Sequence, residues 1–124
     1  MTVSNFGQIM PLQGHMLFMA GYGPSKSEGS RGLEMPDDLN GRVENILVGR
    51  TRLIATTGHD FDVSLSDWHN ALLGDPNFAA KYRFARAWRA VEKAILEQIN
   101  NPDRKQVEAL AKAALVGENP VFDR

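Results

Sequence analysis

The segment from Ala20 to Ser27 is rich in glycine and ends in a Lys-Ser pair, which is the composition of a loop that binds the phosphates of a nucleotide. Such a loop needs glycine at two fixed positions before the Lys-Ser pair, so that backbone amides can wrap around the phosphates. Ala20 and Ser25 occupy those positions, so the spacing fails. We therefore interpret the segment as a linker.

His59, Asp60 and Asp62 are clustered in one short stretch, and their side chains are of the types that bind metal ions. The other two histidines, His15 and His69, are isolated, and the sequence has no second cluster with ligand spacing. Because a metal site needs several converging ligands, we expect no metal here and interpret the two acids as turn residues.

A Ser-His-Asp set can be assembled from Ser66, His69 and Asp60, but nothing near them has the form of the strained turn that exposes a nucleophilic serine. The chain has no cysteine, which excludes disulfides, thiolate metal sites and cysteine nucleophiles, and which fits a reducing cytoplasm. We therefore expect no catalytic residues, no cofactor and no enzymatic activity.

The charges are unevenly distributed, although the net charge of −1 gives no overall attraction to nucleic acid. Between Lys81 and Lys93 the chain has five basic residues and one acid, Glu92. The stretch from Glu28 to Glu44 is mainly acidic. Because a nearly neutral chain can still present one basic face, the segment 81–93 is a candidate basic surface.

The length of 124 residues suits one domain with appendages. Its longest apolar run, Met16 to Ala20, is far shorter than the roughly 20 residues of a membrane span. No basic residue precedes Lys26, so a signal peptide is not expected either. Residues 1–36 are interrupted by glycine and proline, which predicts a flexible or extended arm with an apolar anchor.

After this arm, the apolar spacing predicts a mainly α fold. The expected helices are two short ones over about 39–49 and 52–57, a capped one from Ser64 to Leu73, a long one over 76–99, and a last one from Pro102 to Gly117. A strand from Ile46 to Thr57 is an open alternative, because Ile, Val and Thr favour strands.

The long predicted helix has an apolar side and a basic side. The basic side consists of Arg83, Arg86, Arg89 and Lys93. The apolar side, which we predict to be an interface between subunits, consists of Phe84, Trp88, Val91, Ile95 and Ile99. The last helix has an apolar face of mainly alanine and leucine, which is too small to cover this side. Coverage by the N-terminal arm is the alternative.

Short helices joined by a tight turn, followed by a helix with exposed polar side chains, are the ingredients of helix-turn-helix DNA binding. When Leu65, Trp68 and Leu72 point inward, the outward positions are Ser66, Asp67, His69 and Asn70. Asn pairs well with adenine, and Ser or His reaches base edges or phosphates. An ordinary helical bundle with a solvated face explains the same residues equally well.

The run from Leu65 to Ala87 resembles the small terminase subunits of tailed bacteriophages. In that family a recognition helix is followed by a short acidic link, a Phe, a Tyr and an Ala-Arg pair that open a long helix. The matching positions here are Asp75-Pro76-Asn77-Phe78, Tyr82 and Ala85-Arg86, with Gly49 at the first inter-helix turn. The resemblance covers roughly residues 40–98. The chain departs from the family at Ala71-Leu72, where a Trp is usual, and in a longer, more acidic turn over 58–63.

The resemblance implies a helix-turn-helix-like DNA-binding head over 37–74, a helical hairpin for oligomerisation over 75–116, and a tail over 117–124. It implies a subunit that binds the packaging site on double-stranded DNA and assembles into a homo-oligomeric ring. This ring delivers DNA to the large terminase subunit, the ATPase and nuclease, in the host cytoplasm. The expected DNA-binding residues are Arg50, Arg52, Ser66, His69, Asn70, Arg83 and Arg86. The alternatives are a small helix-turn-helix transcriptional regulator and a phage protein-interaction module that does not bind DNA.

Overall fold

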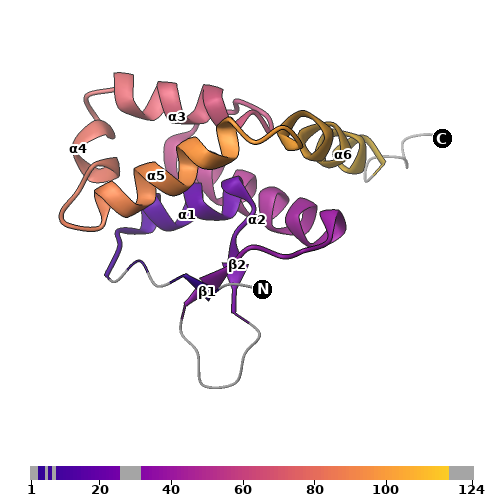
Figure 1. Ribbon diagram of the computed structural model, residues 1–124. Helices are drawn as coiled ribbons and strands as arrows, with labels where there is room; N and C mark the ends of the chain where they lie inside the picture. Colours follow the sequence, from indigo (N-terminus) through magenta and orange to yellow (C-terminus); the bar gives the residue numbers. More distant parts are fainter. Residues whose placement is uncertain (1–2, 5, 7, 26–31, 118–124) are drawn as a thin grey trace.

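The computed structural model describes residues 3–4, 6, 8–25 and 32–117. Most of these residues lie in helices, which confirms the predicted mainly α fold. The elements are β1 (Val3–Ser4), α1 (Pro11–Ala20), β2 (Gly23–Pro24), β3 (Leu33–Glu34), α2 (Leu39–Thr57), α3 (Leu65–Gly74), α4 (Ala79–Tyr82), α5 (Trp88–Ile99) and α6 (Arg104–Gly117) (Figure 1). Residues 26–31 of the predicted arm and 118–124 of the predicted tail lie outside the described residues.

The helix α1 lies inside the molecule, where it packs against α2, α3, α4 and α5. Met16, Leu17 and Met19 are fully buried. A helix that is apolar on nearly all sides needs such surroundings. The prediction of a flexible or extended arm is therefore wrong for residues 11–20, and the arm's apolar anchor is part of the protein's own core.

The helix α2 is continuous, so the prediction of two short helices over 39–49 and 52–57 is wrong, as is the strand alternative. Gly49 is buried within this helix, and a Cβ there would lie 2.5 Å from the backbone nitrogen of Met19. The glycine therefore allows α2 to approach the α1 backbone closely, and it does not open a turn. The helix ends at Gly58, whose φ of 76° is left-handed.

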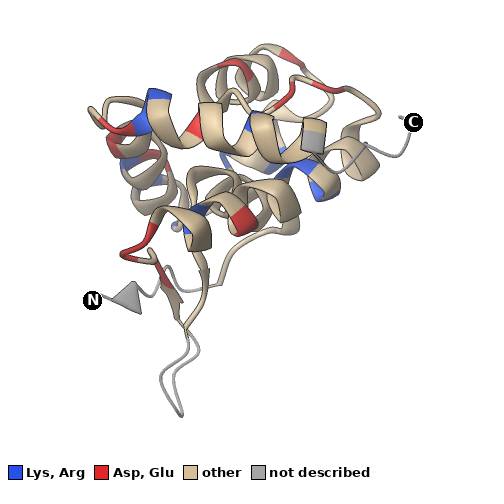
Figure 2. Ribbon diagram, turned by 90° about the vertical axis from the view of Figure 1, so that its right-hand side faces the viewer, with Lys and Arg blue, Asp and Glu red and all other residues tan. Residues whose placement is uncertain are grey.

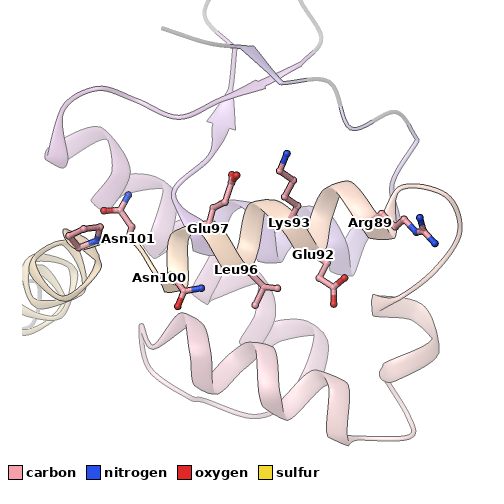
Figure 3. Close-up of a pocket in the computed structure, with 8 residues that line it drawn as sticks. Arg89, Glu92, Lys93, Leu96, Glu97, Asn100 and Asn101 are labelled. Carbon is pink, nitrogen blue, oxygen red and sulfur yellow. The ribbon is translucent and has the colours of Figure 1, made fainter.

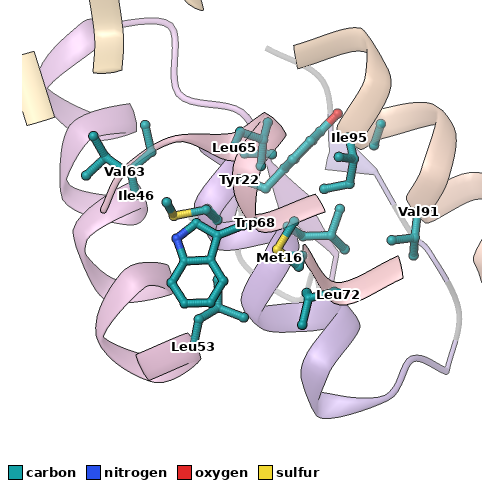
Figure 4. Packing of buried hydrophobic residues seen from close by; sticks show 14 of the residues in the cluster. Met16, Tyr22, Ile46, Leu53, Val63, Leu65, Trp68, Leu72, Val91 and Ile95 are labelled. Atoms are coloured by element: carbon teal, nitrogen blue, oxygen red, sulfur yellow. The ribbon is translucent and has the colours of Figure 1, made fainter. Parts of the chain in front are cut away.

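The helix α3 begins as predicted, because the Ser64 hydroxyl accepts a hydrogen bond from the Asp67 amide at 3.3 Å. Its inner face contributes Leu65, Trp68 and Leu72 to the core (Figure 4). The Trp68 indole also donates to the Asp62 carbonyl oxygen at 2.8 Å. The inward and outward faces of α3 therefore follow the predicted spacing at these three apolar positions.

The long helix predicted over 76–99 is interrupted, and α4 and α5 are joined by a loop over 83–87. The fully buried Gln13 of α1 donates from its side-chain amide to the carbonyl oxygens of Tyr82 and Phe84, at 2.9 and 3.0 Å. These carbonyl oxygens therefore accept from Gln13, whereas in a continuous helix they would accept from backbone amides four residues later. Ala85 follows with a left-handed φ of 61°.

The helix α6 packs against α2, so the arrangement differs from the predicted hairpin of the last two helices. Arg104, at its start, is buried and donates to the carbonyl oxygens of Met19 and Ala20 at the end of α1. Its guanidinium also pairs with Glu108, which accepts from the Leu65 amide. This network fixes α6 to the ends of α1 and α3. The short strands form an antiparallel sheet in the order β1-β3-β2.

Candidate nucleic-acid interface

Five exposed basic side chains come from α4, from the loop that joins α4 to α5, and from the first half of α5. This loop lies at one end of the molecule (Figure 1). We call these five side chains the basic loop surface: Lys81, Arg83, Arg86, Arg89 and Lys93. Among the residues that the structure describes, the ion pairs are Arg50–Asp60, Arg104–Glu108 and Lys112–Asp62. None of the five cations takes part in such a pair.

Acidic residues are absent from the sequence between Pro76 and Val91. The acid that follows, Glu92, points to the opposite side of α5 from Lys93 (Figure 3). By contrast, acidic and basic residues alternate over the side of the molecule that Figure 2 presents. The positive charge is therefore least compensated at Lys81, Arg83 and Arg86, because Glu92 and Glu97 share α5 with Arg89 and Lys93.

The N-terminus of α5 adds to this potential. Its amide groups have no side-chain cap, and its first turn contains no acid. Unsatisfied amides and the helix dipole create positive potential at a helix N-terminus, where anions such as phosphate bind. Arg89, in that first turn, reinforces the same potential.

A buried cluster supports the basic loop surface from below. Tyr82 is fully buried, its ring packs edge-on against Trp88 at 4.8 Å, and a hydrogen bond of 2.7 Å joins its hydroxyl to His69 Nδ1. Burial, reinforced by the Glu92 carboxylate, raises the pKa of Tyr82 well above its usual range. Burial lowers the pKa of His69, which Glu92 opposes, so this imidazole is neutral at neutral pH. The cluster is therefore uncharged.

His69 was predicted to face outward on α3 and to contact DNA, but it is 5% exposed and bonded to Tyr82. The prediction is wrong for this residue, because α4 and α5 cover that side of α3. Ser66 is half-buried, whereas Asp67 and Asn70 are exposed. Since α3 has no basic residue, its exposed face carries no positive charge toward a phosphate backbone.

Arg50 and Arg52, the other predicted DNA contacts, lie on α2 and have partners within the protein. Arg50 pairs with Asp60 at 2.8 Å. The guanidinium of Arg52 lies over the Phe18 ring, 4.8 Å from its centre. Of the predicted DNA-binding residues, only Arg83 and Arg86 belong to the basic loop surface.

Two of the predicted interface residues, Val91 and Ile95, are fully buried in the subunit's own core. The prediction that these two residues form a contact between subunits is wrong, because α1 packs against this side of α5 and covers it. Trp88 and Ile99 are half-buried against the same core. Phe84 remains 53% exposed.

A shallow groove of about 710 Å³ runs along the outer side of α5 (Figure 3). It is lined by Arg89, Glu92, Lys93, Leu96, Glu97, Asn100, Asn101 and Pro102. The two cations and two carboxylates offset one another, so the groove has no strong preference for an anion. The 40% exposed Leu96 gives it an apolar centre.

Sequence reasoning singled out the basic residues of 81–93 but not Gln13, which holds the loop that presents them. A glutamine between apolar residues carries no local signal of a contact made with residues 82 and 84. Across the described ranges, no helix is long and apolar enough to cross a membrane. Comparisons with family models, curated proteins and solved structures found no match to this chain.

Proposed function

We propose that this chain is a non-catalytic protein that binds double-stranded DNA through the basic loop surface. The observation that carries the proposal is the set of five exposed cations on 81–93, without ion pairs among the described residues and beside an uncapped helix N-terminus. Phosphates neutralised by Lys and Arg release condensed counterions, which drives binding to DNA of any sequence. A surface of this kind suits a phosphate backbone.

The mode of binding in this proposal differs from insertion of α3 into the major groove. A recognition helix usually approaches DNA with basic or neutral polar side chains, because the groove is flanked by phosphates. The exposed face of α3 offers Asn70 beside the acidic Asp67. In this proposal the loop over 83–87 and α5 therefore supply most of the free energy of DNA binding. Asn70 remains a candidate for contacts with bases.

The biological role within this proposal is DNA recognition in viral genome packaging, as in small terminase subunits. The support for the role is the resemblance over Leu65 to Ala87, which includes three cations of the basic loop surface, Lys81, Arg83 and Arg86. The homo-oligomeric ring and the large terminase subunit as a partner are parts of the same proposal. Since Val91 and Ile95 are buried in the subunit, other surfaces would hold such a ring.

A protein-interaction module is the second candidate, and the groove on α5 favours it. Its balanced charges and the exposed Leu96 suit a polar peptide with an apolar anchor better than a polyanion. This candidate needs no DNA binding at all. A dimeric transcriptional regulator shares the DNA-binding prediction and differs in oligomeric state.

The test is the binding of the full chain to labelled duplex DNA, measured by fluorescence anisotropy between about 50 and 200 mM salt. We expect clear binding at the low end that weakens steeply toward the high end. No binding at about 50 mM salt, where electrostatic attraction is strong, would overturn the proposal in favour of the interaction module. Native mass spectrometry of the same sample distinguishes a ring from a dimer.

A further inference from the structure

Phe84 is the one exposed residue among the phenylalanine, tyrosine and tryptophan side chains that the structure describes, with 53% of its surface exposed. The neighbouring aromatic side chains, Tyr82 and Trp88, pack into the core. An exposed ring contributes little to folding, because the hydrophobic effect acts through removal of apolar surface from water. About half of the Phe84 surface therefore remains in contact with water and is accessible to a ligand.

The backbone that presents Phe84 is firmly held. The buried side-chain Nε2 of Gln13 donates to the carbonyl oxygens of Tyr82 and Phe84, and its side-chain Oε1 accepts from the Met10 backbone amide at 2.8 Å. On the other side, Ala85 has a left-handed backbone, which is strained for a residue with a Cβ. Strained backbone in a rigid setting is concentrated at binding sites, where it fixes a side chain in advance.

The surroundings of Phe84 limit what can cover its ring. Arg83 and Arg86 flank it, and both are exposed. A two-fold contact with a second copy would bring these cations face to face, which costs free energy. A single ring is also a weak membrane anchor, because interfacial binding depends on a large apolar face. Duplex DNA has phosphates on its outside, which suit the cations, and stacked base pairs on its inside, which suit the aromatic ring.

We propose that Phe84 is a wedge that inserts between adjacent base pairs from the minor groove and bends the duplex, while Arg83 and Arg86 contact the flanking phosphates. The proposal rests on the DNA-binding function and specifies its mode. Apolar side chains that enter a base step from the minor groove unstack it and kink the DNA. Since pyrimidine–purine steps unstack most easily, we expect tighter binding to duplexes rich in TA steps.

The experiment uses the full chain and a duplex of about 30 base pairs, long enough to report bending. The duplex carries a donor and an acceptor dye at its ends, and 2-aminopurine at TA steps to report unstacking. Wild type is compared with Phe84→Ala, Phe84→Leu and Leu110→Ala. Leu110, 40% exposed on α6, is the matched control for loss of an exposed apolar side chain.

Wild type and Leu110→Ala should shorten the distance between the dyes and raise 2-aminopurine fluorescence. Phe84→Ala should bind about tenfold more weakly, as expected for loss of one stacking contact, and should lose both signals. Its salt dependence should stay unchanged, because no charge is removed. Phe84→Leu should keep part of the bend, since leucine also acts as a wedge.

Equal affinity and equal bending by wild type and Phe84→Ala would overturn the wedge and leave DNA binding intact. Failure of wild type to bind DNA would overturn the proposed function, and the wedge with it. A parallel arm with anionic phospholipid vesicles tests the membrane alternative. Binding to vesicles that depends on Phe84, without unstacking of DNA, would make this residue a membrane anchor and contradict the wedge.

Discussion

The exposed face of α3 and the basic loop surface are neighbours in the chain, but they differ in charge and in how the core holds them. The helix α3 exposes Asp67 and Asn70 and no cation. The basic loop surface exposes five cations, and a buried glutamine from α1 holds the backbone at Tyr82 and Phe84. A regular helix with polar positions is therefore not the better DNA-binding surface here. A loop fixed by long-range hydrogen bonds offers both the charge and the rigidity.

The substitution Gln13→Leu tests whether the hydrogen bonds from Gln13 hold the loop between α4 and α5. Replacement by leucine removes both donations to the loop and leaves buried polar groups without partners, which should cost about 2–3 kcal/mol of unfolding free energy. Chemical denaturation measures this loss. Gln106→Leu, at an exposed site on α6, is the control and should change little. Equal stability of the two variants would show that Gln13 does not hold the loop.

The strain in the loop can be relieved at Ala85. Glycine tolerates the left-handed φ of 61°, so Ala85→Gly should stabilise the fold, or leave it unchanged, within about 1 kcal/mol. The same change at the exposed Ala113 of α6 should destabilise by about 1 kcal/mol, as usual in a helix interior. Thermal unfolding of the two variants measures this difference in stability. Equal destabilisation by both changes would mean that Ala85 is not strained.

The contact between α3 and α4 should respond to pH through His69. Its pKa is lowered from 6.5 by burial, so the folded state binds this proton less readily than the unfolded state. Stability from this residue is complete above pH 6.5 and falls as the pH decreases below that value. His69→Gln should reduce the fall in Tm between pH 7 and pH 5. An unchanged profile in His69→Gln would contradict the role of His69.

The smallest effect is expected on the exposed face of α3. If this face is not the main DNA contact, Asn70→Ala should change the affinity for duplex DNA of mixed sequence by no more than about twofold. Competition between duplexes of different sequence shows whether Asn70 reads bases. A missing bidentate contact to a base costs about 1–3 kcal/mol of discrimination between sequences. If Asn70→Ala reduces the ratio of affinities for different duplexes by about tenfold or more, α3 is a recognition helix after all.

Features set by local chemistry could be predicted from the sequence. The Ser64 cap, the end of α3 at Gly74 and the mainly α class all follow from side chains near one another in the chain. Features set by long-range contacts could not. Gly49 has the character of a helix breaker until the α1 backbone lies against it, and the break at Ala85 depends on a glutamine about seventy residues earlier.

The candidate site divides in the same way. The cations of 81–93 are visible in the sequence. Periodicity predicted that they lie along one side of a continuous helix, but α4 ends at Tyr82 and α5 begins at Trp88. His69, Val91 and Ile95 have spacings that allow either exposure or burial. Only the position of α1 decides between the two for Val91 and Ile95.

The most direct test of DNA binding by the basic loop surface compares salt dependence between matched pairs of cations. Arg83 and Arg86 are replaced together by alanine in one variant, and the exposed Lys105 and Lys112 of α6 are replaced in the other. We predict that the first variant lowers the log–log slope of affinity against salt by about 1.8, or about 0.9 for each lost phosphate contact, and that the second leaves it unchanged. Equal slopes for wild type and both variants would contradict the assignment of DNA binding to this surface.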